Sequence, residues 1–291
     1  MAIGLIFISL AVAVTRKIPA AGALMMANFF VFILSSFGPG ASDGLSTIQR
    51  ELSLHSDKLA AAEPIAFVQL FTSMFVHADF YHLFGNLIVL FAFAFPFEER
   101  IGPGRFTALY FIAGMLGSLA QVVSSWGDTI ILMGASGAVF GIIGAFAGSY
   151  PRVVLPLPLP LLIIMIFVRM RVVVAAIIFA LMQILYLQFL SPLDNTAYWA
   201  HLGGLAAGLA LAPIFKPRHH EEDRFFAVQA PNLAAFATNE KARSALSHME
   251  ASKDEKDVYQ AWLQVFVEHA EDAQGNRLTI HRGEIQIVSG N

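Results

Sequence analysis

The sequence contains no cysteine and few charged residues. Only 13% of its 291 residues are Asp, Glu, Lys or Arg, whereas soluble domains average about 25%. The missing cysteines exclude disulfides, thiol catalysis and cysteine-ligated zinc sites. The formal net charge of −3 comes without any basic stripe, so we expect no nucleic-acid partner.

Apolar residues take the place of the missing charges. They make up 57% of the chain, and the mean hydropathy is +0.65. They lie in continuous runs near the ~20 residues that a helix needs to cross a bilayer. The runs lack the alternation of barrel strands, so the sequence predicts an all-α polytopic membrane protein.

We expect seven spans, with a short extra one at the N-terminus. Arg16 and Lys17 follow the apolar residues 1–14 instead of preceding them, which is the reverse of a secretion signal. The region 38–68 has the composition of a polar, amphipathic loop. The expected spans cover residues 1–14, 19–37, 71–95, 106–125, 135–149, 172–190 and 199–215.

The apolar run 153–168 is not expected to span. It contains Pro156, Pro158 and Pro160, and each interior proline costs a helix roughly 3 kcal/mol. If this run is an interfacial or re-entrant segment that does not cross the membrane, the Lys and Arg residues of all short loops lie on the same side of the membrane. The positive-inside rule then predicts an outside N-terminus and a cytoplasmic C-terminus.

The composition changes sharply after Lys216. We therefore expect three parts: an extra transmembrane segment (1–18), a membrane domain (19–215) and a soluble cytoplasmic tail (216–291). The tail pattern predicts a helix over 239–270 and a strand–turn–strand over 277–288. His219 and His220 are interpreted as part of a solvated linker, and we expect neither a metal nor a cofactor.

Three groups of polar residues occur within the expected spans. Ser136 lies in Gly134-Ala135-Ser136-Gly137, and His201 lies in Ala200-His201-Leu202-Gly203-Gly204. His82 and Asn86 are spaced i, i+4 and so share one helix face. Polar and ionisable residues inside a membrane are candidates for function, and these four are expected toward the outer leaflet.

Ser136 and His201 fit a nucleophile and its base. A serine hydroxyl is a weak nucleophile until a neighbouring base takes its proton, and desolvation favours the neutral histidine that can accept it. Asn86, His82 and the backbone N–H of Ser136 are candidate donors to a developing oxyanion. Acidic residues are missing at this depth, and Asp79 is interpreted as too shallow, so we expect a Ser/His dyad.

Small-residue pairs offer a way to bring the two spans together. Gly137 and Gly141 lie in one span, and Gly204 and Gly208 lie in the other. Pairs with this spacing allow helix backbones to approach closely in a membrane. A helix that begins near Phe75 would place His82 roughly 10 Å along its axis from the mouth.

This set of motifs resembles the rhomboid family of intramembrane serine proteases over residues 19–215. The resemblance implies a six-helix core, to which residues 1–18 would add one span. It implies that Ser136 and His201 form the dyad and that His82 and Asn86 help to build the oxyanion hole. It further implies a structural role for His77, a ring contact between Phe140 and His201, and lateral substrate entry past the span at 172–190.

We therefore expect an intramembrane serine endopeptidase that cleaves single-span membrane proteins near the outer leaflet. The expected location is a bacterial or archaeal plasma membrane. A catalytically inactive relative that binds membrane clients is the first alternative, and the presence of both Ser136 and His201 argues against it. A small transporter is the second, but intramembrane acidic residues and repeated halves are missing.

Overall fold

The structure is a computed structural model, and it describes residues 19–36, 44–161, 164–189, 196–216, 277–281 and 284–288. The chain divides into two compact units, Met1–Lys216 and Pro217–Asn291. In the second unit, β5 (Arg277–His281) and β6 (Glu284–Val288) pair antiparallel, which confirms the expected strand pair. The span expected over 1–18 and the helix expected over 239–270 lie outside the described residues.

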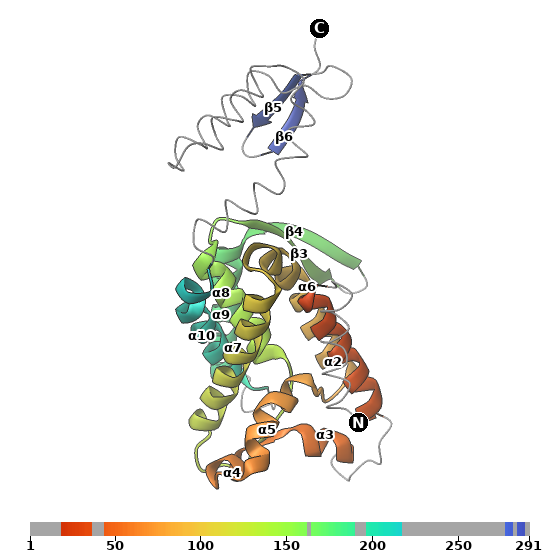
Figure 1. The fold of residues 1–291 in the computed structure, drawn as a ribbon, viewed down its shortest axis with the longest axis vertical. Coiled ribbons are helices and arrows are strands. Elements are labelled where there is room, and N and C mark those ends of the chain that lie inside the picture. The colour runs from red at the N-terminus through yellow and green to blue at the C-terminus, as the bar shows by residue number, and fades with distance from the viewer. Residues whose placement is uncertain are drawn as a thin grey trace. The chain divides into compact units, whose positions relative to one another are not determined.

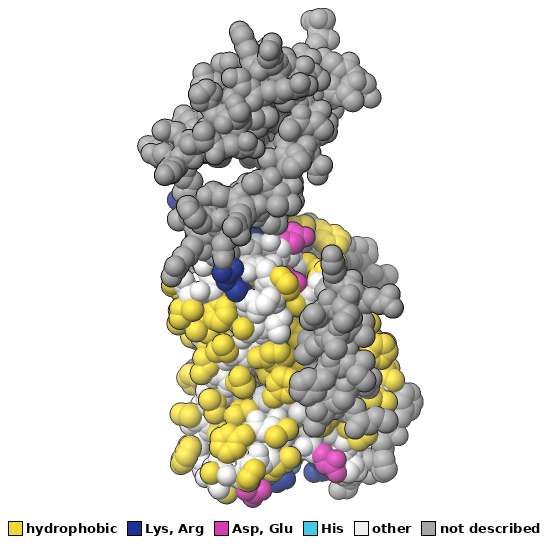
Figure 2. Space-filling model, in the orientation of Figure 1, with side chains coloured by type: hydrophobic (Ala, Val, Ile, Leu, Met, Phe, Trp, Pro, Cys, Tyr) yellow, Lys and Arg dark blue, Asp and Glu magenta, His cyan; other side chains and the backbone are white. Residues whose placement is uncertain are grey.

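Long apolar helices form the main body of the described part of the first unit (Figure 1). Four of them have the length and composition needed to cross a membrane, and Figure 2 shows hydrophobic side chains covering the middle of the unit, with charged side chains toward its two ends. The protein is therefore an integral, multi-pass membrane protein, and the expected all-α polytopic fold is confirmed. The helices are α2 (Ala20–Ser36), α6 (Phe80–Ile101), α7 (Pro103–Ser124), α8 (Ser136–Ser149), α9 (Val172–Phe189) and α10 (Tyr198–Phe215).

Short elements fill the connection between α2 and α6, where the sequence predicted a loop over 38–68. Glutamine side chains tie these elements together: the Gln49 amide donates to the His77 carbonyl at 2.9 Å, and the Gln69 amide donates to the Glu51 carbonyl at 3.0 Å. The elements are α3 (Thr47–Leu52), β1 (Leu54–His55), α4 (Ser56–Ala60), α5 (Pro64–Thr72) and the 3₁₀ turn η1 (Ser73–Phe75).

The prediction that one span begins near Phe75 was wrong. The chain turns after η1, and α6 begins at Phe80. Asp79 is the N-cap residue, and its side chain accepts the His82 N–H at 2.9 Å, which satisfies one of the amides left free at a helix start. His82 therefore lies in the first turn of α6 and not ~10 Å along the helix.

Residues 154–171 form a β-hairpin, which confirms that this run is not a spanning helix. Strand β3 (Val154–Leu161) pairs antiparallel with β4 (Ile164–Arg171), and Pro156 lies opposite Arg169. The Val172 N–H donates to the Val153 carbonyl at 2.8 Å, so the odd-numbered residues of β3 direct their backbone groups toward β4. The three prolines occupy even positions, where a missing N–H removes no ladder hydrogen bond.

Helix α8 is short and central. Its 14 residues cover about 21 Å, which is less than the ~30 Å hydrocarbon core of a bilayer. All but Ser136 and Gly148 are buried, because α6, α7, α9 and α10 surround the helix. A helix of this length does not by itself reach across the hydrocarbon core.

Helices α8 and α10 approach each other backbone to backbone. A Cβ atom at Gly204 would overlap the Gly137 carbonyl, and one at Gly208 would overlap the Gly141 carbonyl. The contacts follow the same order along both helices, so α8 and α10 run parallel. The expected pairing of small residues is confirmed.

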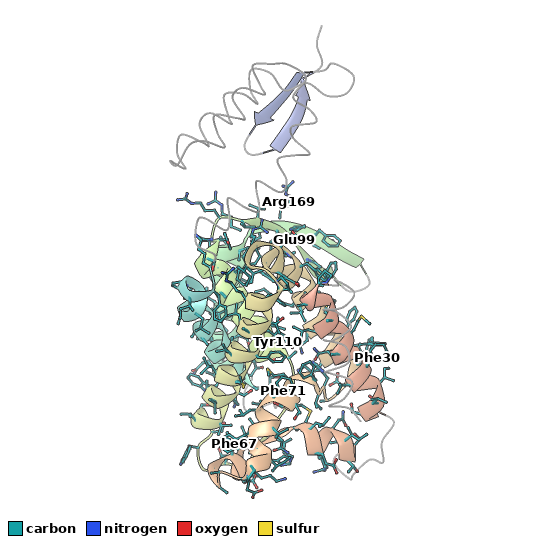
Figure 3. All side chains as sticks on the ribbon, viewed as in Figure 1. Phe30, Phe67, Phe71, Glu99, Tyr110 and Arg169 are labelled. Atoms are coloured by element: carbon teal, nitrogen blue, oxygen red, sulfur yellow. The ribbon has the colours of Figure 1, made fainter. Side chains whose placement is uncertain are left out.

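Glu98 joins two helices at the end of the bundle that carries the hairpin. Its carboxylate, which is buried, accepts the backbone N–H groups of Ala20 and Ala21, each at 2.7 Å. The last turn of α6 thus caps the first turn of α2. Charge-assisted bonds of this kind stabilise helix starts. Figure 3 places the neighbouring Glu99 at the same end as Arg169, while Tyr110 lies in the middle of the bundle and Phe67 at the opposite end.

We predict that Gly208→Ala destabilises the membrane domain. The new methyl group would overlap a backbone carbonyl that cannot rotate away, and overpacking typically costs about 1–3 kcal/mol. Thermal unfolding in detergent, followed by circular dichroism, should show a lower midpoint. Gly104→Ala is the control, because nothing lies within 4 Å of a Cβ at that helical position. Equal midpoints for the two variants would contradict the role given to the glycine contact.

Candidate active site

Ser136 is the first residue of α8. The loop before it carries β2 (Ile131–Leu132), which pairs with β1 and so ties the loop to the α3–α5 region. Gly134 has a φ of +121° and donates its N–H to the Ser73 carbonyl at 2.9 Å. Because Ser136 opens a helix, its backbone N–H has no intrahelical acceptor and lies at the positive end of the helix dipole.

His201 lies in the first turn of α10, and a side chain from α7 holds that turn. The Gln121 side-chain oxygen accepts the N–H groups of Trp199 at 3.1 Å and Ala200 at 3.3 Å. The N-cap residue of α10, Ala197, has no side-chain oxygen for this purpose. Gln121 therefore replaces the missing cap and fixes the direction in which α10 enters the bundle.

The structure brings Ser136 and His201 together. The distance from Ser136 Oγ to His201 Nε2 is 2.7 Å, although 65 residues separate them in the sequence. Both side chains are partly buried. A hydroxyl at this distance from an imidazole nitrogen is in position to transfer its proton to that nitrogen.

Two further side chains fix the His201 ring. The Phe140 ring, one turn below Ser136 on α8, stacks on the imidazole with a centroid distance of 4.6 Å and an interplanar angle of 2°. The contact expected from the family resemblance is therefore confirmed. The Gln183 side-chain oxygen lies 2.7 Å from His201 Nδ1, on the opposite side of the ring from Ser136.

His82 and Asn86 line the α6 side of the site. A Cβ built on Gly134 would lie 2.8 Å from both Cε1 and Nε2 of His82, and 3.8 Å from Ser136 Oγ. The His82 ring is thus close to the residues that precede α8. Asn86 is buried one turn further along α6, and its amide donates to the His82 carbonyl at 2.9 Å.

His77 supports this corner of the site. Its ring is fully buried and meets the His82 ring edge to face, with a centroid distance of 5.1 Å. Its carbonyl accepts the Gln49 amide. These contacts agree with the structural role that the resemblance implied for His77.

Two glutamines, Gln121 and Gln183, meet His201 or its helix turn and were not among the residues expected from the sequence. Asp79, the acidic residue considered as a partner of the histidine, instead caps α6. A polar residue in an otherwise apolar span is the signal that was available for Gln183. Within the described parts of the chain, no group of three or more His, Asp or Glu side chains could hold a metal ion.

Comparisons with known proteins show what the chain is similar to. A family model described as "Rhomboid domain" matches residues 65–218, which is more than half of the chain. "Rhomboid-like protease 3" of Toxoplasma gondii is 30% identical over 158 residues, covering 54% of this chain and 55% of that protein. "RHOMBOID-like protein 5" of Arabidopsis thaliana is 29% identical, covering 52% and 45%.

An Arabidopsis thaliana relative named "Inactive RHOMBOID-like protein 8" is also similar. It is 30% identical over 153 residues, which cover 52% of this chain and 39% of that protein. The chain spans about half the length of the first two relatives. Similarity alone therefore does not assign an activity to this chain.

We predict that Gly134→Ala slows the reaction of Ser136 with a fluorophosphonate probe by about 10²-fold, the usual cost of losing one oxyanion donor, which is the role that the sequence predicts for His82. The added methyl group would displace the His82 ring and strain a backbone with positive φ. Gly127→Ala is the matched control, because its φ is +97° and its Cβ would meet nothing within 4 Å. A similar loss in both variants would assign the effect to backbone strain and not to His82.

Proposed function

Because the chain belongs to the rhomboid family, we propose that it is an intramembrane serine endopeptidase with a Ser136/His201 dyad. The observation that carries the proposal is the 2.7 Å distance between Ser136 Oγ and His201 Nε2. In this proposal residues 19–215 form the catalytic domain, and residues 216–291 form a soluble cytoplasmic tail.

The proposed reaction is acyl transfer through Ser136. Its Oγ attacks the carbonyl carbon of the scissile peptide bond while His201 Nε2 takes the hydroxyl proton. The same nitrogen then gives this proton to the leaving amine, which breaks the C–N bond and leaves an ester on Ser136. Water, deprotonated by His201, hydrolyses the ester and releases the new carboxylate.

The proposed oxyanion hole consists of the Ser136 backbone N–H and the side chains of His82 and Asn86. The Ser136 N–H belongs to the first residue of α8, where the helix dipole favours negative charge. The closeness of His82 to Gly134 and the burial of Asn86 support their assignment as donors. Donors held rigidly in a site of low dielectric stabilise a transition state most effectively.

The proposed substrates are single-span membrane proteins cleaved near the outer leaflet. A peptide bond inside a helix is shielded by its own backbone, so the substrate must unwind locally before it reaches Ser136. Entry past α9 is consistent with the loose packing of that helix, whose second half exposes Leu181, Ile184 and Leu185. The proposed location is a bacterial or archaeal plasma membrane.

The proposed orientation puts the active site toward the outside. One end of the helix bundle carries most of the basic residues of the membrane domain. They lie in the last turn of α6, the first turn of α7, the hairpin region and the end of α10. This end is the cytoplasmic one by the positive-inside rule, and Ser136 lies toward the other. The residues are Arg100, Arg105, Arg152, Arg169, Arg171 and Lys216.

We predict that purified protein in proteoliposomes cleaves a labelled single-span substrate and that Ser136→Ala and His201→Ala each abolish cleavage. The first change removes the nucleophile and the second removes its base. Circular dichroism should report unchanged helix content in both variants. A wild-type protein that captures several substrates without cleaving any would support instead the role of an inactive, client-binding membrane protein; one relative is named "Inactive RHOMBOID-like protein 8".

We predict that Asn86→Ala lowers kcat by ~10²–10³-fold, the usual cost of removing one oxyanion donor. KM should change little, since the interaction strengthens only when the oxyanion forms. Steady-state kinetics on the same substrate separate the two constants. An effect confined to KM would indicate that Asn86 binds the substrate and does not stabilise the transition state.

A further inference from the structure

Gln183 differs from its neighbours on α9. The second half of this helix exposes its apolar side chains, among them Leu181 at 55%, Ile184 at 51% and Leu185 at 54%. Gln183 is only 6% exposed and is the buried residue of this half. An amide buried in an apolar environment costs free energy unless it is hydrogen-bonded, so its position calls for a specific partner.

That partner is the nitrogen of His201 that does not meet Ser136. The Gln183 Oε1 atom lies 2.7 Å from His201 Nδ1, and Nε2 lies 2.7 Å from Ser136 Oγ. A carbonyl oxygen only accepts hydrogen bonds. If the neutral imidazole donates to this oxygen, its proton is on Nδ1, and the lone pair of Nε2 is directed at the serine hydroxyl.

We propose that Gln183 is a positioning residue that determines which nitrogen of His201 carries the proton. The inference rests on the proposed function for its kinetic consequence, but the tautomer itself is a property of the folded protein. Phe140 fixes the plane of the ring by stacking, and Gln183 fixes its proton. In this protein a neutral amide from α9 occupies the place beside the histidine that an acidic residue holds in a Ser-His-Asp triad.

A pair of substitutions separates hydrogen bonding from packing. Gln183→Met has a similar length and shape but lacks an acceptor, whereas Gln183→Glu keeps an oxygen that accepts from Nδ1–H. Gln188→Met is the matched control, because it makes the same change on an exposed position of the same helix. All variants are compared as full-length protein in proteoliposomes.

The kinetic readouts are substrate cleavage and the rate at which a fluorophosphonate probe labels Ser136. For Gln183→Met we expect both kcat and the labelling rate to fall on the order of 10- to 100-fold, with KM unchanged, since a buried partner is left unsatisfied. Gln183→Glu should retain most of the labelling rate, and Gln188→Met should match wild type. A loss confined to KM, or equal losses in the Met and Glu variants, would overturn the proposal.

The tautomer is measured directly by ¹⁵N nuclear magnetic resonance of histidine-labelled protein, with His201→Ala used to assign the signals. We expect the wild-type His201 proton on Nδ1 and its redistribution to Nε2 in Gln183→Met. A wild-type proton on Nε2 would overturn the inference. If the tautomer behaves as expected but the wild type neither cleaves substrate nor reacts with the probe, the inference stands and the proposed function fails.

Discussion

The contact between the backbones of α8 and α10 is the constraint on which the site depends. The two helices run parallel, and Gly204 faces Gly137 while Gly208 faces Gly141. Ser136 and His201 are the residues near the start of each helix, so this register brings them to one level. Because lipid removes most of the hydrophobic drive for helix association, close packing of small residues takes over that role. The 2.7 Å distance between the two side chains follows from this contact.

A second constraint comes from the apolar surroundings, in which backbone and side-chain polar groups must find partners within the protein. Glu98 of α6 caps the first turn of α2, and Gln121 of α7 caps the first turn of α10. Gln183 of α9 satisfies His201 in the same way. In each case the polar side chain belongs to one helix and the group it satisfies to another. These hydrogen bonds between helices therefore connect the orientation of the helices to the geometry of the site.

Hydropathy and proline spacing predicted most of the helices but not the details of two segments. The run 71–95 is largely apolar and was therefore predicted as one span, although Ser73, His77 and Asp79 lie in its first part, where the chain turns before α6 begins at Phe80. The prolines of 154–161 correctly excluded a helix. Their regular alternation also suits a strand, but a strand requires a partner, and the sequence of 164–171 did not identify this segment as that partner.

The sequence by itself predicted the membrane fold class, Ser136 and His201 as the candidate dyad, and the helix pair that carries them, because apolar runs and rare polar residues are local properties of the chain. The tertiary structure decided what surrounds the dyad. Phe140, Gln121 and Gln183 meet His201 or its helix turn from three different helices. Gln183 is 18 residues from His201 in the sequence and Gln121 is 80. Such contacts depend on how the helices pack, and the spacing of residues along one chain does not encode them.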